Sequence, residues 1–287
     1  MYFTQQMLRQ KSKLLINVLR LKEISLMTGF SVIGIFFTDH TIWTQLVILK
    51  TIISIFAYVV NIYALNSLAD YSFDKHSDRL NAVSKVSQTQ YLLIFSTSLL
   101  VYLILSFSIH PSNTLFYLLG LFLWILYYLP PFRFKSTFLI GTFIHLIAGT
   151  IHFHMGYTAF ATFSVDSWYI SLFFGLLLAS GHFHHEILDF QDDKQAGIST
   201  TTVRIGTHKS QVLRSFTLGI AAGLWTILFY LQAISENTYL IFSIPTIILL
   251  LFSVYYKDRN VRFYQRISRT IFLIAGIIYF CNRLFSI

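Results

Sequence analysis

Nine long apolar segments dominate the sequence and constrain its fold more than any other feature. They cover residues 23–38, 43–69, 91–109, 113–129, 137–160, 168–189, 212–234, 239–256 and 269–286. A helix needs about 20 mostly apolar residues to cross the hydrocarbon core of a membrane. Only 11% of the 287 residues are charged, less than half of the roughly 25% typical of soluble domains. The sequence therefore predicts an all-α, polytopic membrane protein, with residues 1–287 forming one domain of nine transmembrane helices.

Basic residues are concentrated in alternate loops between these segments. Of the 21 Lys and Arg residues, only Lys50 and Arg283 fall on the opposite predicted side. Because cytoplasmic loops are enriched in Lys and Arg, we expect the N-terminus in the cytoplasm and the C-terminus outside. The asymmetry and attraction to anionic lipid explain the net charge of +9 without nucleic acid as a partner. We expect a multi-pass protein of the lipid bilayer, in the cell inner membrane if the organism is bacterial.

The first 22 residues are basic and polar, with only a short apolar patch and no small-residue cleavage site. A cleaved signal peptide is therefore not expected. Such a segment is typical of an amphipathic arm that lies on the surface of the membrane.

Three polar residues follow one another at helical spacing near the cytoplasmic end of the second segment. Asn66, Asp70 and Asp74 stand four residues apart, so their side chains share one face of a helix. Like charges at this spacing repel each other, and a cation is needed to neutralise them. Oxygen ligands of this kind suit a hard ion such as Mg²⁺.

A second acidic cluster lies at the cytoplasmic end of the sixth segment. Glu186, Asp189 and Asp193 share one helix face, and His182 lies on it one turn before Glu186. Carboxylates near the membrane are costly and indicate a functional site by default. Two acidic helix faces at the same membrane surface predict two metal-binding halves that hold one polyphosphate between them.

The motifs around these clusters resemble those of the UbiA superfamily of intramembrane prenyltransferases. The first is Asn66-x3-Asp70-x3-Asp74, and the second is Asp189-x3-Asp193 followed by Lys-Gln-Ala-Gly-Ile-Ser-Thr. Between them lies Tyr127-Tyr-Leu-Pro-Pro-Phe-Arg-Phe-Lys135, which is similar to a segment of the family. The resemblance implies a helical bundle around a central cavity and transfer of an isoprenyl group from a prenyl diphosphate donor.

The resemblance also implies roles for individual residues. The Mg²⁺ ligands that it implies are Asn66, Asp70, Asp74, Asp189 and Asp193. Basic residues expected at the leaving diphosphate are Arg133 and Lys135, which lie in the matched segment, and Lys75, Arg79 and Lys194. Tyr71 and Tyr127 are expected to line the site, Glu186 to contact metal or acceptor or to serve as a base, and His182 to contact the acceptor.

The acceptor is the least determined part of this hypothesis. Ser67 stands where the family often has Asp, and His185-Glu186 replaces an Asn or Asp common at the second motif. We expect an aromatic acceptor such as a hydroxybenzoate or a quinone precursor. Prenyl transfer to a lipid phosphate and a membrane terpene cyclase remain alternatives. A cation-coupled transporter is less favoured, because transporter carboxylates usually lie near the middle of the membrane.

Overall fold

The computed structural model describes residues 21–74, 87–255 and 261–285. Within these ranges the chain forms helices and no strands. The long helices are α2 (Leu21–Phe36), α3 (Gln45–Asp74), α4 (Gln88–Ile109), α5 (Pro111–Tyr128), α6 (Ile140–Tyr157), α7 (Val165–Gln195), α9 (Thr207–Tyr230), α10 (Glu236–Tyr255) and α11 (Val261–Phe285). A short helix, α8 (Thr201–Ile205), lies between α7 and α9. The described part of the chain therefore confirms the all-α prediction.

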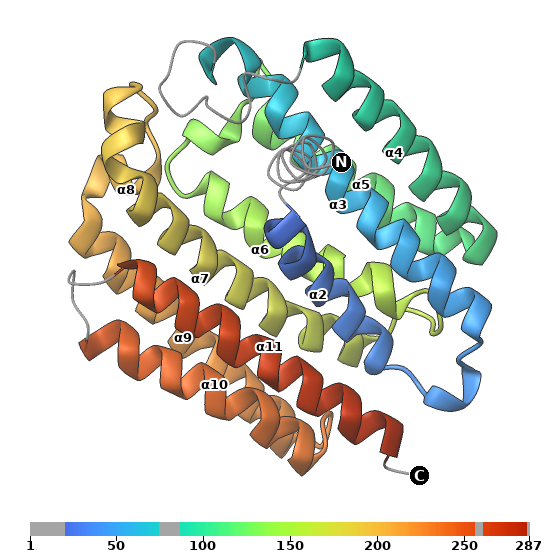
Figure 1. Cartoon of the computed structure of the whole chain (residues 1–287). Coiled ribbons are helices and arrows are strands. Elements are labelled where there is room, and N and C mark those ends of the chain that lie inside the picture. The colour runs from blue at the N-terminus through green and yellow to red at the C-terminus, as the bar shows by residue number, and fades with distance from the viewer. Residues whose placement is uncertain (1–20, 75–86, 256–260, 286–287) are drawn as a thin grey trace, which may run out of the picture.

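The helices form a ring in which each long helix packs against the next in sequence. The ring closes because α2 contacts α11 as well as α3, while α6 and α7 form one of the most extensive contacts in the bundle (Figure 1). Successive helices are joined by short connections and run in opposite directions, as expected for hydrophobic segments that repeatedly cross a bilayer. The C-terminal ends of α3 and α7 both point toward the upper left of Figure 1.

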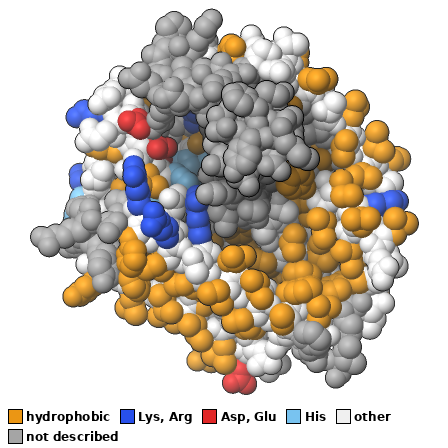
Figure 2. All heavy atoms as spheres, viewed as in Figure 1, with side chains coloured by type: hydrophobic (Ala, Val, Ile, Leu, Met, Phe, Trp, Pro, Cys, Tyr) orange, Lys and Arg blue, Asp and Glu red, His pale blue; other side chains and the backbone are white. Residues whose placement is uncertain are grey.

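Five helices are long and apolar enough to cross a membrane. They lie at Gln45–Tyr71, Gln88–Ile109, Thr207–Tyr230, Glu236–Tyr255 and Arg262–Leu284. Large hydrophobic side chains such as Ile104, Phe107 and Leu251 are exposed on the outside of the bundle, and hydrophobic side chains cover most of the face in Figure 2. Exposed apolar surface on this scale indicates contact with lipid. The count of nine spans and the orientation of the N-terminus stay predictions.

Three boundaries differ from those predicted from hydrophobicity. Helix α3 continues past residue 69 to Asp74, and α7 continues past residue 189 to Gln195. The polar ends of both helices keep helical geometry, although their composition no longer resembles a membrane span. Helix α11 begins at Val261, eight residues before the predicted start at Arg269. Arg269 therefore lies inside the last helix rather than at its boundary.

Glycines allow α6 to pack closely against α2. A Cβ atom added at Gly34 would lie 2.0 Å from the carbonyl oxygen of Phe153, and one at Gly156 would lie 1.8 Å from that of Ser31. Both distances are far below van der Waals contact, so only glycine is compatible with this separation. Small residues at helix contacts are common in membranes, where association depends on close packing.

Candidate functional site

The centre of the site is the carboxylate of Asp70 on α3, which two basic residues contact. Lys135 donates to both carboxylate oxygens of Asp70, with its Nζ 2.6 Å from Oδ2. Arg133 donates from Nη2 to Oδ1 of Asp70 at 3.3 Å. The Lys135 side chain is 13% exposed and that of Asp70 is 17% exposed. This ion pair is mostly shielded from solvent, so its attraction is stronger than that of a surface pair.

The chain between α5 and α6 brings these two cations to Asp70. After Pro130-Pro131, Arg133 has a φ of 39° in the left-handed region, and a short 3₁₀ helix, η4 (Phe134–Ser136), follows. Leu139 has a φ of 58°, and its backbone N–H donates to Thr201 Oγ1 at 3.0 Å. The connection is thereby held against the segment that follows α7, so elements far apart in sequence meet at the site.

Glu186 on α7 is buried and is held by α8. Its Oε2 accepts from the backbone N–H of Thr202 at 2.8 Å and from Thr202 Oγ1 at 3.1 Å. Thr202 Oγ1 lies 2.9 Å from Ser210 Oγ on α9. The Oε1 atom of Glu186 lies 3.7 Å from His182 Nδ1. One carboxylate oxygen therefore anchors α8, and the other faces His182.

His182 connects three helices. Its Nε2 is 3.1 Å from the hydroxyl of Tyr127 on α5, and its Nδ1 is 3.1 Å from Thr142 Oγ1 on α6. The ring of His145 lies 3.8 Å from that of His182, centroid to centroid. His145 Nδ1 lies 2.8 Å from the carbonyl oxygen of Gly141, to which it must donate. These contacts fix both imidazoles between α5, α6 and α7.

Tyr127 lies within electrostatic range of both acidic motifs. Asp70, Glu186 and Asp193 are all close enough to act on its hydroxyl. Two helices that are more than a hundred residues apart in sequence thus place their carboxylates around one buried tyrosine. Figure 2 shows acidic and basic side chains gathered at the upper left of the molecule.

The remaining residues predicted at the site lie at different depths. Asn66 and Tyr71 are half-buried on α3. Asp189 is exposed and Asp193 is half-buried on α7, and the exposed Lys194 lies 5.9 Å from the ring centroid of Phe190.

Several predicted positions cannot be assessed from the structure. Asp74 is the last residue of α3, and its side chain is not described. Lys75, Arg79 and residues 1–20 of the basic arm lie outside the described residues.

The donor set fits a hard divalent cation. In the ranges 21–74, 87–255 and 261–285, no three His, Cys, Asp or Glu side chains converge on one point. The oxygens offered by Asn66, Asp70, Asp189 and Asp193 nevertheless come from two helices that both approach Tyr127. Mg²⁺ commonly uses one or two protein carboxylates together with phosphate oxygens and water, so a complete protein cage is not needed.

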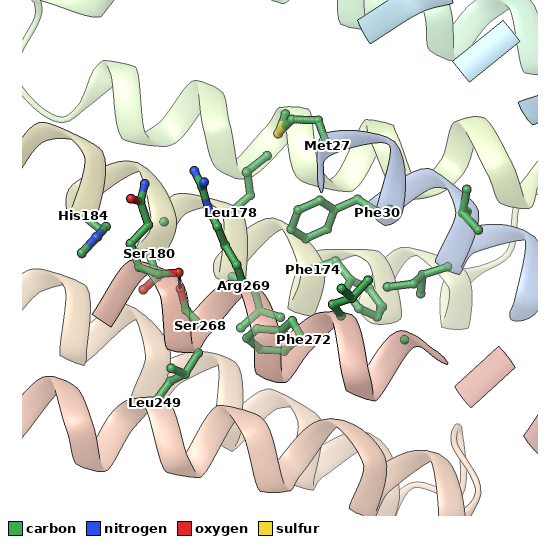
Figure 3. A pocket seen from close by; sticks show the side chains of 18 of the residues that line it. Met27, Phe30, Phe174, Leu178, Ser180, His184, Leu249, Ser268, Arg269 and Phe272 are labelled. Atoms are coloured by element: carbon green, nitrogen blue, oxygen red, sulfur yellow. Dashed lines mark hydrogen bonds between the residues drawn. The ribbon is translucent and has the colours of Figure 1, made fainter. Parts of the chain in front are cut away.

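A cavity of about 520 Å³ lies beside this site, between α2, α7 and α11. Figure 3 shows Met27 and Phe30 from α2, Phe174 from α7 and Phe272 from α11 around it. The cavity also reaches Tyr63 of α3 and His185 of α7. Tyr63 lies seven residues before Asp70, on the same face of α3. The cavity therefore adjoins the helix faces that carry both acidic motifs.

Sequence reasoning missed several residues of this region. Thr142, His145 and Thr202 organise His182 and Glu186, but their partners are distant in sequence. No local pattern predicts such contacts. A buried cluster of Arg214, His184 and Tyr264 beside the cavity was missed for the same reason.

The fold and the site define an all-helical membrane protein with two acidic motifs and a pair of cations arranged for a polyphosphate. A model of the UbiA prenyltransferase family matches residues 27–277. The chain belongs to this family of prenyltransferases, and the predicted family resemblance is confirmed. A search of curated protein sequences gives no match.

Solved structures share the fold at low sequence identity. A UbiA homologue from Archaeoglobus fulgidus bound to GPP and Mg²⁺ has a TM-score of 0.81 at 18% identity, covering 94% of this chain and 97% of its own. A UbiA homologue from Aeropyrum pernix K1 has a TM-score of 0.74 at 14% identity, covering 90% and 97%. A digeranylgeranylglyceryl phosphate synthase has a TM-score of 0.70 at 17% identity, covering 96% and 98%.

Proposed function

We propose that this protein is a Mg²⁺-dependent enzyme that transfers an isoprenyl group from a prenyl diphosphate to an aromatic acceptor. The observation that carries the proposal is the convergence of Asp70, Glu186 and Asp193 on Tyr127, with Lys135 and Arg133 on Asp70. The Archaeoglobus fulgidus homologues bound to GPP or DMAPP with Mg²⁺ support the donor and the ion.

The diphosphate is held by metal ions and by cations of the connection between α5 and α6. We assign the metal to oxygens of Asn66, Asp70, Asp74, Asp189 and Asp193. When bound, Mg²⁺ would neutralise charge that develops on the departing diphosphate. Lys135 and Arg133, which contact Asp70 in this structure, turn to the phosphate oxygens and share that charge. Lys75, Arg79 and Lys194 are further candidates for phosphate contact.

The aromatic residues of the site protect the electron-poor prenyl carbon. Tyr71 and Tyr127 present π faces that attract a positive charge. Burial of Tyr127 and His182 keeps water away from the reacting carbon.

Glu186 receives the proton that the acceptor loses, with His182 beside it. Its Oε2 already accepts two hydrogen bonds from Thr202, so Oε1 is the oxygen left for a proton. As the bond from the prenyl carbon to diphosphate breaks and the bond to the acceptor forms, the acceptor proton passes to this oxygen.

We also propose that the site faces the cytoplasm. Arg133 and Lys135 lie at the same end of the bundle as Lys194 and Arg204 in the loops that follow α5 and α7. Loops rich in Lys and Arg favour the cytoplasmic side. Nine spans, a cytoplasmic N-terminus and, in a bacterium, the inner membrane follow from this orientation.

A lipid-phosphate acceptor is the second candidate. The digeranylgeranylglyceryl phosphate synthase shares the fold over 96% of this chain. The apolar cavity between α2 and α11 accommodates a lipid-like acceptor as well as an aromatic one.

A diphosphate-release assay on the purified protein tests the proposal. Geranyl, farnesyl and geranylgeranyl diphosphates are offered with Mg²⁺, with and without hydroxybenzoates, quinol precursors and a prenylglyceryl phosphate. We expect release that requires Mg²⁺, increases with one acceptor and is lost in the Asp70→Ala, Asp189→Ala double variant. Asp166→Ala is the matched control, because Asp166 is an exposed carboxylate at the opposite end of α7.

Each outcome of this assay has a definite meaning. Release without an acceptor, giving a hydrocarbon or a cyclic alcohol, would identify a terpene cyclase instead. Equal rates in the wild type and the double variant would refute the assigned metal site.

A further inference from the structure

Arg269 occupies a position that is unfavourable for a charged side chain. The membrane-spanning part of α11 is Arg262–Leu284, so Arg269 lies about 10 Å along the helix from its start at 1.5 Å per residue. Its side chain is half-buried, and no ion pair among the described residues includes it. Charged residues inside a membrane span are functional candidates by default. The guanidinium therefore needs a role beyond loop topology.

Arg269 extends into the cavity between α2, α7 and α11 (Figure 3). The other lining residues with strongly polar side chains are Ser180, His184, His185, Gln265 and Ser268. They come from the cytoplasmic half of α11 and from the facing part of α7. Farther along α11, the cavity is lined by Phe272, Gly276 and Phe280. The cavity thus has a cationic, hydrogen-bonding end and a long apolar remainder.

The hydrogen bonds of His184 supply a second, independent observation. Arg214 is buried, its guanidinium lies 4.1 Å from the ring of Tyr264, and its Nη1 is 3.1 Å from His184 Nδ1. Because an arginine is always protonated and can only donate, Nδ1 of His184 must accept. A neutral His184 therefore carries its proton on Nε2. This atom is buried and has no hydrogen-bond partner, although His184 is only 4% exposed.

A buried donor without a partner is unfavourable and calls for an acceptor atom. Arg269 and the Nε2–H of His184 both line the same end of the cavity, and Arg269 acts electrostatically on His184. Two donors, one of them a guanidinium, match the oxygens of a carboxylate or a phosphate.

This end of the cavity is distinct from the diphosphate site. His182 and Glu186 share one face of α7, whereas His184 lies two residues from each, on the other side of the helix. The two regions are connected through His185, which lines the cavity and acts electrostatically on His145 and His182. Gly181 lines the cavity at this level with no atom within 4 Å of an added Cβ. A molecule held at Arg269 can therefore extend toward the reacting groups.

We propose that Arg269 and His184 bind the acid group of the acceptor. The acceptor is then an acidic amphiphile, either an aromatic carboxylate or a lipid phosphate, with its reacting atom directed toward His185 and Tyr63. Any apolar tail lies along α2 and α11. This inference rests on the proposed prenyl transfer and specifies the acceptor that the enzyme takes.

Paired acceptors and matched variants test the assignment. Geranyl diphosphate and Mg²⁺ are supplied with 4-hydroxybenzoate or its methyl ester, and with geranylgeranylglyceryl phosphate or geranylgeranylglycerol. We expect the wild type to prefer the acid of the productive pair. Arg269→Gln is expected to raise the KM of that acid at least tenfold, to abolish the preference over the neutral partner and to leave the KM of the donor unchanged.

Three further variants separate binding from folding. Arg269→Lys keeps the charge and is expected to restore part of the acceptor affinity. Arg266→Gln removes an exposed cation from the same helix, outside the cavity, and is expected to have no effect. Gly181→Leu fills the cavity beside Arg269 without changing charge and is expected to raise the same KM. Gly181→Leu therefore tests the site even if Arg269→Gln does not fold.

A binding measurement covers the case in which the wild type transfers no prenyl group. Thermophoresis of the labelled protein is carried out with 4-hydroxybenzoate and with geranylgeranylglyceryl phosphate, in the presence of unreactive geranyl thiodiphosphate. Tighter binding of one acid to the wild type than to Arg269→Gln supports the site even if the proposed activity fails. Equal binding of both proteins, or equal use of acid and neutral acceptors, overturns it. Loss of a copurified anionic phospholipid from Arg269→Gln, with an unchanged acceptor KM, would assign the site to a bilayer lipid and also overturn it.

Discussion

Replacing Gly156 with alanine tests whether the contact between α2 and α6 has the tightness described above. A Cβ at residue 156 would lie 1.8 Å from the carbonyl oxygen of Ser31, 2.8 Å from its carbonyl carbon and 3.1 Å from the backbone nitrogen of Ile35. All three are backbone atoms, so no side-chain rotation relieves the overlap. Helix α2 must retreat by about 1.5 Å, and gaps of this order remove at least half of the dispersion energy of the separated atoms. We expect the free energy of unfolding to fall by about 3 kcal/mol, the upper part of the range for overpacked sites.

The same substitution at Gly223 is the matched control. Gly223 is exposed on α9, and no atom lies within 4 Å of an added Cβ. Alanine favours a helix over glycine by about 1 kcal/mol, so Gly223→Ala is expected to be neutral or stabilising. Unfolding is followed by circular dichroism during SDS titration in mixed micelles. If Gly156→Ala is within about 0.5 kcal/mol of the wild type, as for an ordinary surface change, the close packing of α2 on α6 is refuted.

Three further substitutions test the site. Lys135→Gln leaves the half-buried Asp70 with only its weaker partner, so we expect the donor KM to rise about tenfold, measured by product formation over a range of donor concentrations. An unchanged donor KM would exclude Lys135 from the phosphate site. Glu186→Ala removes the acceptor of both hydrogen bonds from Thr202 and is expected to cost about 2 kcal/mol in unfolding free energy, measured by SDS titration, as well as activity. Wild-type activity in this variant would refute the role of Glu186. Tyr127→Phe keeps the ring and removes only the hydroxyl, so we expect kcat to fall while stability changes by about 1 kcal/mol or less, measured by turnover and SDS titration. A larger loss of stability than of kcat would assign Tyr127 to packing.

The local pattern of residues predicts the acidic motifs well and their partners poorly. Helical spacing places Asn66, Asp70 and Asp74 on one face, and α3 remains helical through all three positions. The ion pair of Asp70 with Lys135 depends on how the connection after α5 folds back, through left-handed backbone at Arg133. No periodicity in the sequence encodes that path.

Hydrophobicity by itself determined that this chain forms helices in a membrane, because backbone groups in lipid must be satisfied within each segment. Spacing and residue type determined which carboxylates suit a hard cation. The tertiary structure decided what those helices bring together. It placed Glu186 on Thr202, left an N–H of His184 without a partner and put Arg269 inside a cavity rather than at the end of a helix. These outcomes depend on contacts between distant segments, and their energies are set by close packing that no single segment contains.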